Sequence, residues 1–149
     1  MMYLVLFLAL FVDPFAPKAE KPKDPGSDPG YQMALLLWEN IEIPDADKVG
    51  IKAISDAKVF QTGKAGEMGS EYPFVRVYSQ KSVEEVVDFY KMETPEGWKY
   101  ELAYGAHLFF QGDQMKALMG QIPVIQVAEA DNFVEMWPEA KSIITIYYE

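Results

Sequence analysis

The chain of 149 residues contains no cysteine and only one histidine, and both absences exclude classes of chemistry. Without cysteine there is no disulfide, thiolate metal site, covalently attached haem, cysteine nucleophile or N-terminal lipoprotein modification. With His107 as the only histidine, metal centres that need two histidine ligands are excluded. The G-x-S-x-G and H-E-x-x-H motifs of hydrolases are also missing. We therefore expect no cofactor.

Positive charge is also scarce. The chain has 13 Lys and Arg against 23 Asp and Glu, a formal net charge of -10, and no run of five basic residues. Nucleic-acid binding draws most of its affinity from clustered Lys and Arg, so we expect no nucleic-acid partner. An acidic surface is also repelled by anionic lipid headgroups. Solubility is the simplest consequence of this charge.

The one long apolar run extends from Met1 to Val12. A helix needs about 20 apolar residues to span a bilayer, whereas a run of this length is typical of the hydrophobic part of a secretory signal peptide. We therefore predict a signal peptide or N-terminal apolar segment at 1–17, export to the periplasm or cell envelope, and no transmembrane helix in the mature chain. A buried strand or helix of the domain is the alternative interpretation of this run.

The next segment, 18–30, is rich in Pro, Lys, Asp and Gly and offers few side chains to bury. This composition predicts a disordered linker. The remaining residues, 31–149, have the length and the apolar content for one domain around one core.

Hydrophobic patterning within 31–149 predicts an α+β fold. Six segments rich in β-branched or aromatic residues predict strands at 57–62, 74–79, 98–102, 107–111, 123–129 and 142–149. Short helices are expected at 31–40 and 113–120, and a main helix at 82–91. The helices are too few for alternating βαβ units, so we predict an antiparallel sheet of about five or six strands, with one main helix packed on one face and one or two short helices. The last strand is apolar enough to be central.

The stretch S-V-E-E-V-V-D-F-Y-K, residues 82–91, combines acidic and aromatic residues and raises the question of a catalytic site. Ser82 and Glu85 have the S-x-x-E spacing of a capping box, and acidic residues in the first turn are favoured by the helix dipole. The apolar residues of the stretch recur at helical spacing and define one face. These carboxylates therefore have an explanation as helix-forming residues.

A second acidic stretch, 45–56, partly matches a calcium-binding loop. Asp45, Asp47 and Asp56 occupy positions 1, 3 and 12 of the EF-hand pattern. Val49, however, stands where an oxygen ligand belongs, and Lys52 adds a positive charge inside the loop. We expect a polar turn and no metal, with these three aspartates as the only metal-ligand candidates.

Other side chains are weak candidates for chemistry or binding. His107 with Asp113 as a nearby acid is the pair that a small hydrolase or isomerase would use, although a lone histidine on a strand is usually structural. Large aromatic and methionine side chains can line an apolar groove or fill a core. The ligand-binding candidates are Trp38, Trp98, Trp137, Met115 and Met119, to which the pair Tyr147 and Tyr148 is added.

Three stretches together carry a resemblance to a known group of proteins: I-P-D-A-D-K-V at 43–49, S-V-E-E-V-V-D-F-Y-K at 82–91 and G-W-K-Y at 97–100. This arrangement resembles small exported bacterial proteins of uncharacterised function, which have a YPGA-like turn, a P-E-E-V-x-x-F-Y helix and a G-W strand start. The resemblance covers 43–149 and implies export and an α+β fold, without a catalytic residue. We therefore expect a non-catalytic binding or protein-interaction module of the cell envelope, whose partner is a protein or a small apolar ligand. The enzyme that uses His107 is the alternative.

Overall fold

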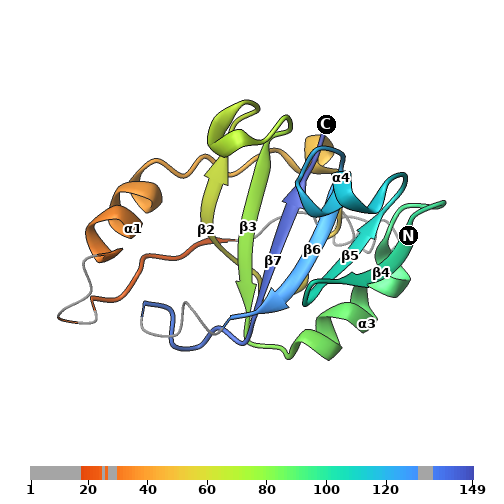
Figure 1. The fold of residues 1–149 in the computed structure, drawn as a ribbon. Helices are drawn as coiled ribbons and strands as arrows, with labels where there is room; N and C mark the ends of the chain where they lie inside the picture. Colours follow the sequence, from red (N-terminus) through yellow and green to blue (C-terminus); the bar gives the residue numbers. More distant parts are fainter. Residues whose placement is uncertain (1–17, 25, 27–29, 131–135) are drawn as a thin grey trace, which may run out of the picture.

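The computed structural model describes residues 18–24, 26, 30–130 and 136–149, and its core is a seven-stranded sheet (Figure 1). The strands are β1 (Lys18–Ala19), β2 (Lys58–Gly63), β3 (Phe74–Ser79), β4 (Lys99–Ala103), β5 (Ala106–Phe110), β6 (Val124–Glu129) and β7 (Ser142–Tyr147). The helices are α1 (Gly30–Glu39), α2 (Ala46–Val49), α3 (Val83–Glu93) and α4 (Gln114–Leu118), with a 3-10 turn at Glu67–Gly69.

The strand order in the sheet is β1-β2-β3-β7-β6-β5-β4. Every neighbouring pair is antiparallel except β1 and β2, which are parallel. The prediction of an antiparallel α+β fold is confirmed, and so is the central place of the last strand, because β7 lies between β3 and β6. Ile143, Ile144 and Ile146 of β7 are buried, and so is Thr145 between them. Burial on both faces of this central strand explains its apolar sequence.

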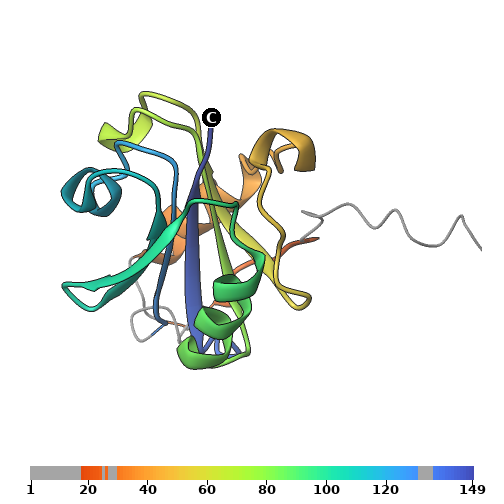
Figure 2. The same cartoon turned by 90° about the vertical axis from the view of Figure 1, so that its right-hand side faces the viewer.

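The helix α3 covers one face of the sheet, and Figure 2 shows it on the side opposite α4. Its start is the predicted cap, because the Ser82 hydroxyl accepts a hydrogen bond from the Glu85 backbone N–H at 3.2 Å. The apolar face of α3 is buried against the sheet, whereas Glu84 and Glu85 are exposed. The buried residues are Val83, Val86, Val87 and Tyr90. The acidic residues of 82–91 thus form the solvated side of a helix.

The opposite face of the sheet carries α1 and α4, which cover different parts of it. Side chains alternate between the two faces of a strand, so Val77 faces α3 while its neighbour Tyr78 faces the other side. Ala34 of α1 packs in the same cluster as Tyr78, and Ala117 of α4 packs in a separate cluster with Leu108. The helix predicted at 31–40 is therefore present as α1, and the one predicted at 113–120 as α4.

Residues 18–24, which we expected to belong to a disordered linker, lie instead against the sheet. The Glu20 N–H donates to the Val59 carbonyl at 2.9 Å, and the Lys23 N–H donates to the Met136 carbonyl at 2.8 Å. The physical reason is that β2 offers free backbone groups along its edge, and pairing with them requires no apolar side chain. The predicted signal peptide at 1–17 and residues 25 and 27–29 of the linker lie outside the described residues.

None of the helices in the described ranges combines the length and hydropathy needed for a bilayer crossing.

Alkaline pH is expected to destabilise the fold through Tyr78. Burial, with smaller contributions from the carboxylates of Glu20, Glu139 and Asp56, raises the pKa of Tyr78 to about 12. The folded state therefore favours the protonated phenol, and the corresponding stability is fully present below pH 10 and is lost between about pH 10 and 12. Urea unfolding at pH 8, 10 and 11 should show that the free energy of unfolding decreases less with rising pH in Tyr78→Phe than in the wild type. Equal losses in both proteins, with the exposed Tyr104→Phe as control, would contradict this assignment.

Candidate functional site

Two adjoining cavities open at one end of the sheet, where β2, β5 and β7 end and β3, β4 and β6 begin. Their volumes are about 610 and 540 Å³. Lys48 and Tyr148 line both, so the cavities lie side by side across the sheet end. We name them the polar cavity and the aromatic cavity after their lining residues.

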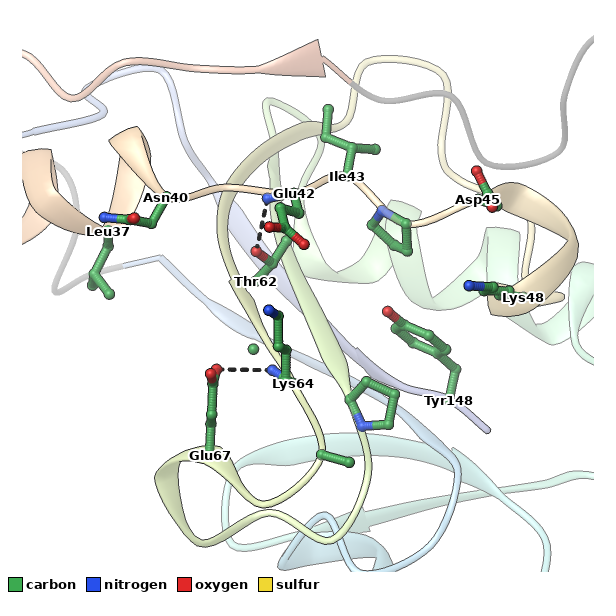
Figure 3. A pocket seen from close by; sticks show the side chains of 14 residues that line it. Leu37, Asn40, Glu42, Ile43, Asp45, Lys48, Thr62, Lys64, Glu67 and Tyr148 are labelled. Carbon is green, nitrogen blue, oxygen red and sulfur yellow. Dashed lines mark hydrogen bonds between the residues drawn. The ribbon is translucent and has the colours of Figure 1, made fainter.

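The polar cavity lies between the segment that follows α1, the start of α2 and the loop that joins β2 to β3 (Figure 3). Two hydrogen bonds order its wall: the Glu42 N–H donates to the Thr62 hydroxyl at 3.3 Å, and the Lys64 N–H donates to the Glu67 carboxylate at 2.8 Å. Charged side chains of both signs line this cavity: Lys48 and Lys64 are basic, and Glu42, Asp45 and Glu67 are acidic. A ligand here meets exposed, well-hydrated groups.

The aromatic cavity is lined by four half-buried aromatic side chains and by two prolines. The aromatic residues are Tyr72, Trp98, Tyr147 and Tyr148, and the prolines are Pro95 and Pro123. Burial raises the pKa of the Tyr148 phenol. The cavity therefore offers aromatic rings together with hydroxyl and amide groups, the Lys48 ammonium and the Glu149 carboxylate.

Local features of the chain place these rings at the sheet end. Tyr148 follows the last strand, and its N–H donates to the Pro73 carbonyl at 3.1 Å. The Tyr147 ring lies against Gly120, where an added Cβ would stand 2.6 Å from two ring atoms. Gly97 has a φ of 88° and turns the chain just before Trp98. Backbone pairing and glycines thus bring residues from distant parts of the sequence to one cavity.

The two residues predicted for catalysis have separate partners in the structure. The Tyr100 hydroxyl and Nδ1 of His107 are 2.6 Å apart, and the two rings are stacked with centroids 5.9 Å apart. The Asp113 carboxylate accepts a hydrogen bond from the Lys116 N–H at 3.0 Å and caps α4. Neither of the ion pairs found in the described ranges involves His107. Among the residues that the structure describes, His107 therefore has a tyrosine partner and no carboxylate that would orient it as a base.

The predicted ligand-binding residues are dispersed over the molecule. Trp98 is the tryptophan that lines the aromatic cavity. Trp137 is buried against Phe60 on the face opposite α3, with ring centroids 5.1 Å apart. Trp38 lies on α1, with the Lys21 ammonium 5.5 Å from its ring centroid. Met115 on α4 and Met119, the residue that follows this helix, are exposed. The sequence singled out the aromatic pair Tyr147 and Tyr148 as well, and both line the cavity.

The three aspartates considered for calcium are not assembled into a site. Asp45 precedes α2 and lines the polar cavity. The Asp56 carboxylate accepts hydrogen bonds from the Ser79 hydroxyl at 2.7 Å and from the Gln80 N–H at 2.8 Å. No group of three or more His, Asp or Glu side chains within the described ranges is placed to hold a metal ion.

The sequence also contains an S-x-x-K spacing, from Ser55 to Lys58. In serine acyl-enzymes with this motif, a helix holds the two side chains one turn apart on the same face. Here Ser55 is exposed in a turn and Lys58 is the first residue of β2. The geometry that the motif requires is therefore absent at these two residues.

Comparisons with protein-family models, curated proteins and solved structures find no match to this chain. Fold and site define an α+β protein with two adjoining cavities at one end of its sheet. Its function is therefore argued from these cavities and from the faces of the sheet.

Proposed function

We propose that this protein is a non-catalytic binding module, exported to the cell envelope, which holds an apolar ligand in the aromatic cavity. The observation that supports the proposal is the set of four half-buried aromatic side chains around a volume of about 540 Å³. Pockets of roughly 300–1,000 Å³ with apolar walls and a few polar groups are typical of small-molecule sites.

The binding energy would come from the aromatic surface that remains exposed. Each Å² of apolar surface that is removed from water contributes about 25 cal/mol, and Tyr and Trp present much rigid surface for few rotatable bonds. Lys48 and Gln111 also line this cavity and can hydrogen-bond a polar end of the ligand. A small apolar molecule or an apolar segment of a protein fits this chemistry.

Binding of Nile red, a neutral apolar dye, tests the proposal. We expect the fluorescence of the dye to increase with wild-type protein, and the affinity to fall at least about tenfold in Trp98→Leu, because the indole forms part of the wall. The matched control is Trp38→Leu, since Trp38 lies on α1 and does not line the aromatic cavity. Equal dye binding by both variants, each with a wild-type circular dichroism spectrum, would overturn the proposed site.

A further inference from the structure

A row of four polar residues crosses the sheet on the face opposite α3. The register of neighbouring strands pairs Gln61 with Arg76, Arg76 with Thr145, and Thr145 with Gln126. The row separates the two apolar clusters of this face, one containing Ala34 and the other Ala117. Gln126, at one end of the row, donates from its amide to the Ala117 and Leu118 carbonyls and so holds the end of α4.

Arg76, the only arginine of the chain, is the charged member of this row. Its side chain is half-buried, and its hydrogen bonds go to neutral acceptors: Nε donates to the Thr145 hydroxyl at 3.2 Å, and Nη1 donates to the Gln61 amide oxygen at 3.1 Å. The Phe74 ring centroid is 5.9 Å from the guanidinium carbon. These contacts fix the plane of the guanidinium and leave donors beyond the two that they use.

No acidic side chain of the described ranges pairs with Arg76, although the chain carries 23 Asp and Glu. The two ion pairs found there are Lys52 with Glu93 and Lys99 with Glu101. A half-buried charge without a counter-ion is unfavourable, whereas a guanidinium held in one plane is well suited to bind a carboxylate through two parallel hydrogen bonds. Within the described ranges, Arg76 therefore keeps donors that a carboxylate can use.

The surroundings of Arg76 indicate what carries this carboxylate. Figure 1 shows α1 and α4 on either side of β3 and β7. Apolar side chains are exposed at both helices: Met33 and Leu36 on α1 are 58% and 53% exposed, and Met115 on α4 and Met119 just after it are 52% and 59% exposed. Exposed methionine and leucine side chains are typical of surfaces that bind amphipathic peptides.

We propose that this face docks a peptide segment of a partner protein, in which an Asp or Glu carboxylate binds Arg76 and the neighbouring apolar side chains contact α1 and α4. Charge complementarity sets the choice of the occupant, because the site supplies one fixed cation and a mostly acidic chain repels strongly acidic partners. A peptide with one carboxylate among apolar residues satisfies both conditions. This docking face is distinct from the aromatic cavity.

Selection of randomised 16-residue peptides, displayed on phage, against the wild-type protein tests this inference. We expect the enriched peptides to share an Asp or Glu flanked by apolar residues, and to bind Arg76→Gln at least about tenfold more weakly, because charge-assisted hydrogen bonds are lost. Arg76→Lys keeps the charge and loses the planar fork, so it should recover only part of the affinity. Trp98→Leu should bind these peptides like the wild type.

The arginine side chain supplies a direct measurement that needs no variant. Since the chain has one arginine, its Nε–H gives a single peak in a ¹H–¹⁵N spectrum, and this peak should shift when a selected peptide is added. The same peptide with Gln in place of its acidic residue should leave the peak unmoved. A selection that enriches no peptide, peptides that bind Arg76→Gln like the wild type, or peptides that leave the Nε–H peak in place would overturn the inference. Peptides that require Trp98 instead would belong to the aromatic cavity, and would also count against this docking face.

Discussion

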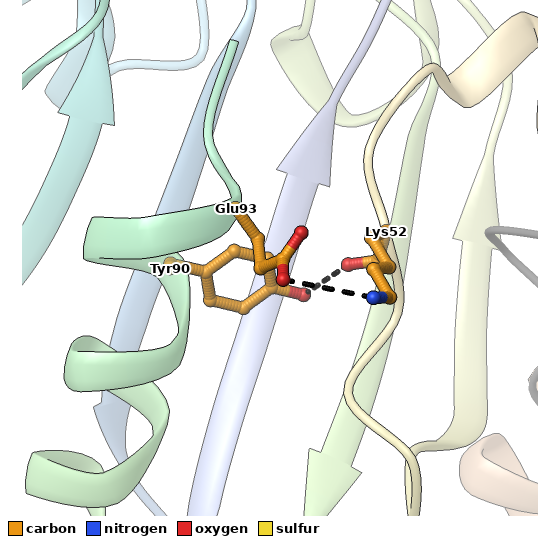
Figure 4. A network of polar contacts seen from close by, with 3 residues as sticks. All are labelled: Lys52, Tyr90 and Glu93. Carbon is orange, nitrogen blue, oxygen red and sulfur yellow. Dashed lines mark hydrogen bonds and ion pairs between the residues drawn. The ribbon is translucent and has the colours of Figure 1, made fainter.

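Replacing Tyr90 with alanine is expected to lower the free energy of unfolding by about 3–5 kcal/mol, the usual range for removal of a buried aromatic side chain. Tyr90 is fully buried between α3 and the sheet. Its ring packs edge-on against Phe89, with centroids 4.9 Å apart, and lies 6.0 Å from Phe109 of β5. Its hydroxyl donates to the Lys52 carbonyl at 3.0 Å, so one residue joins α3, the sheet and the segment after α2 (Figure 4).

Two milder variants separate the contributions at this position. Tyr90→Phe keeps the ring and loses the hydrogen bond, so we expect a loss of about 1–2 kcal/mol. Glu93→Gln removes the ion pair between Lys52 and Glu93, whose side chains are 54% and 37% exposed, and should change stability by less than about 1 kcal/mol. Urea unfolding monitored by tryptophan fluorescence measures all three. A loss below about 1 kcal/mol for Tyr90→Ala would show that Tyr90 does not anchor α3.

Replacing Gly63 with alanine is expected to destabilise the protein by about 1–3 kcal/mol through overpacking. Gly63 of β2 pairs directly with Phe74 of β3, and a methyl group at position 63 would overlap the Phe74 ring. The ring has little room to move, because it is 3% exposed and its centroid lies 5.5 Å from that of Tyr147. The φ of Gly63 is not positive, so the penalty is one of space and not of backbone strain.

A double-mutant cycle checks this steric assignment. Phe74→Leu is destabilising by itself because it removes a buried ring, but it leaves space for a methyl group at position 63. The loss caused by Gly63→Ala should therefore be smaller in the Phe74→Leu background than in the wild type. Equal losses in both backgrounds, measured by urea unfolding, would show that Phe74 does not limit the size of residue 63.

The elements with strong local patterns were predictable from the sequence. Helix α3 combines a capping box with an apolar face at helical spacing, and both signals lie within eleven residues. β7 was expected to be central because its apolar run is unbroken except for Thr145, and it lies in the middle of the sheet. Local sequence therefore predicted the main strands along the chain, the helix α3 and the central place of β7.

The cavities and the polar row depend on contacts between distant residues, and no local pattern reveals them. Lys48, Tyr72, Trp98 and Tyr148 meet because α2 and the ends of several strands come together at one end of the sheet. The sequence did not mark Arg76 as a candidate binding residue, because a single charged residue within a strand is common on an exposed face. The pairing of residues 18–19 with β2 was missed for a related reason, since backbone hydrogen bonds to an edge strand require no side-chain pattern.

Native mass spectrometry of the protein, purified from its own cells without chelator or detergent, tests the proposed binding function most directly. The account predicts a fraction of the protein with the added mass of an apolar molecule or peptide, and loss of this mass in Trp98→Leu but not in Trp38→Leu. Bare protein in the wild-type sample, or added mass that Trp98→Leu retains, would contradict binding in the aromatic cavity.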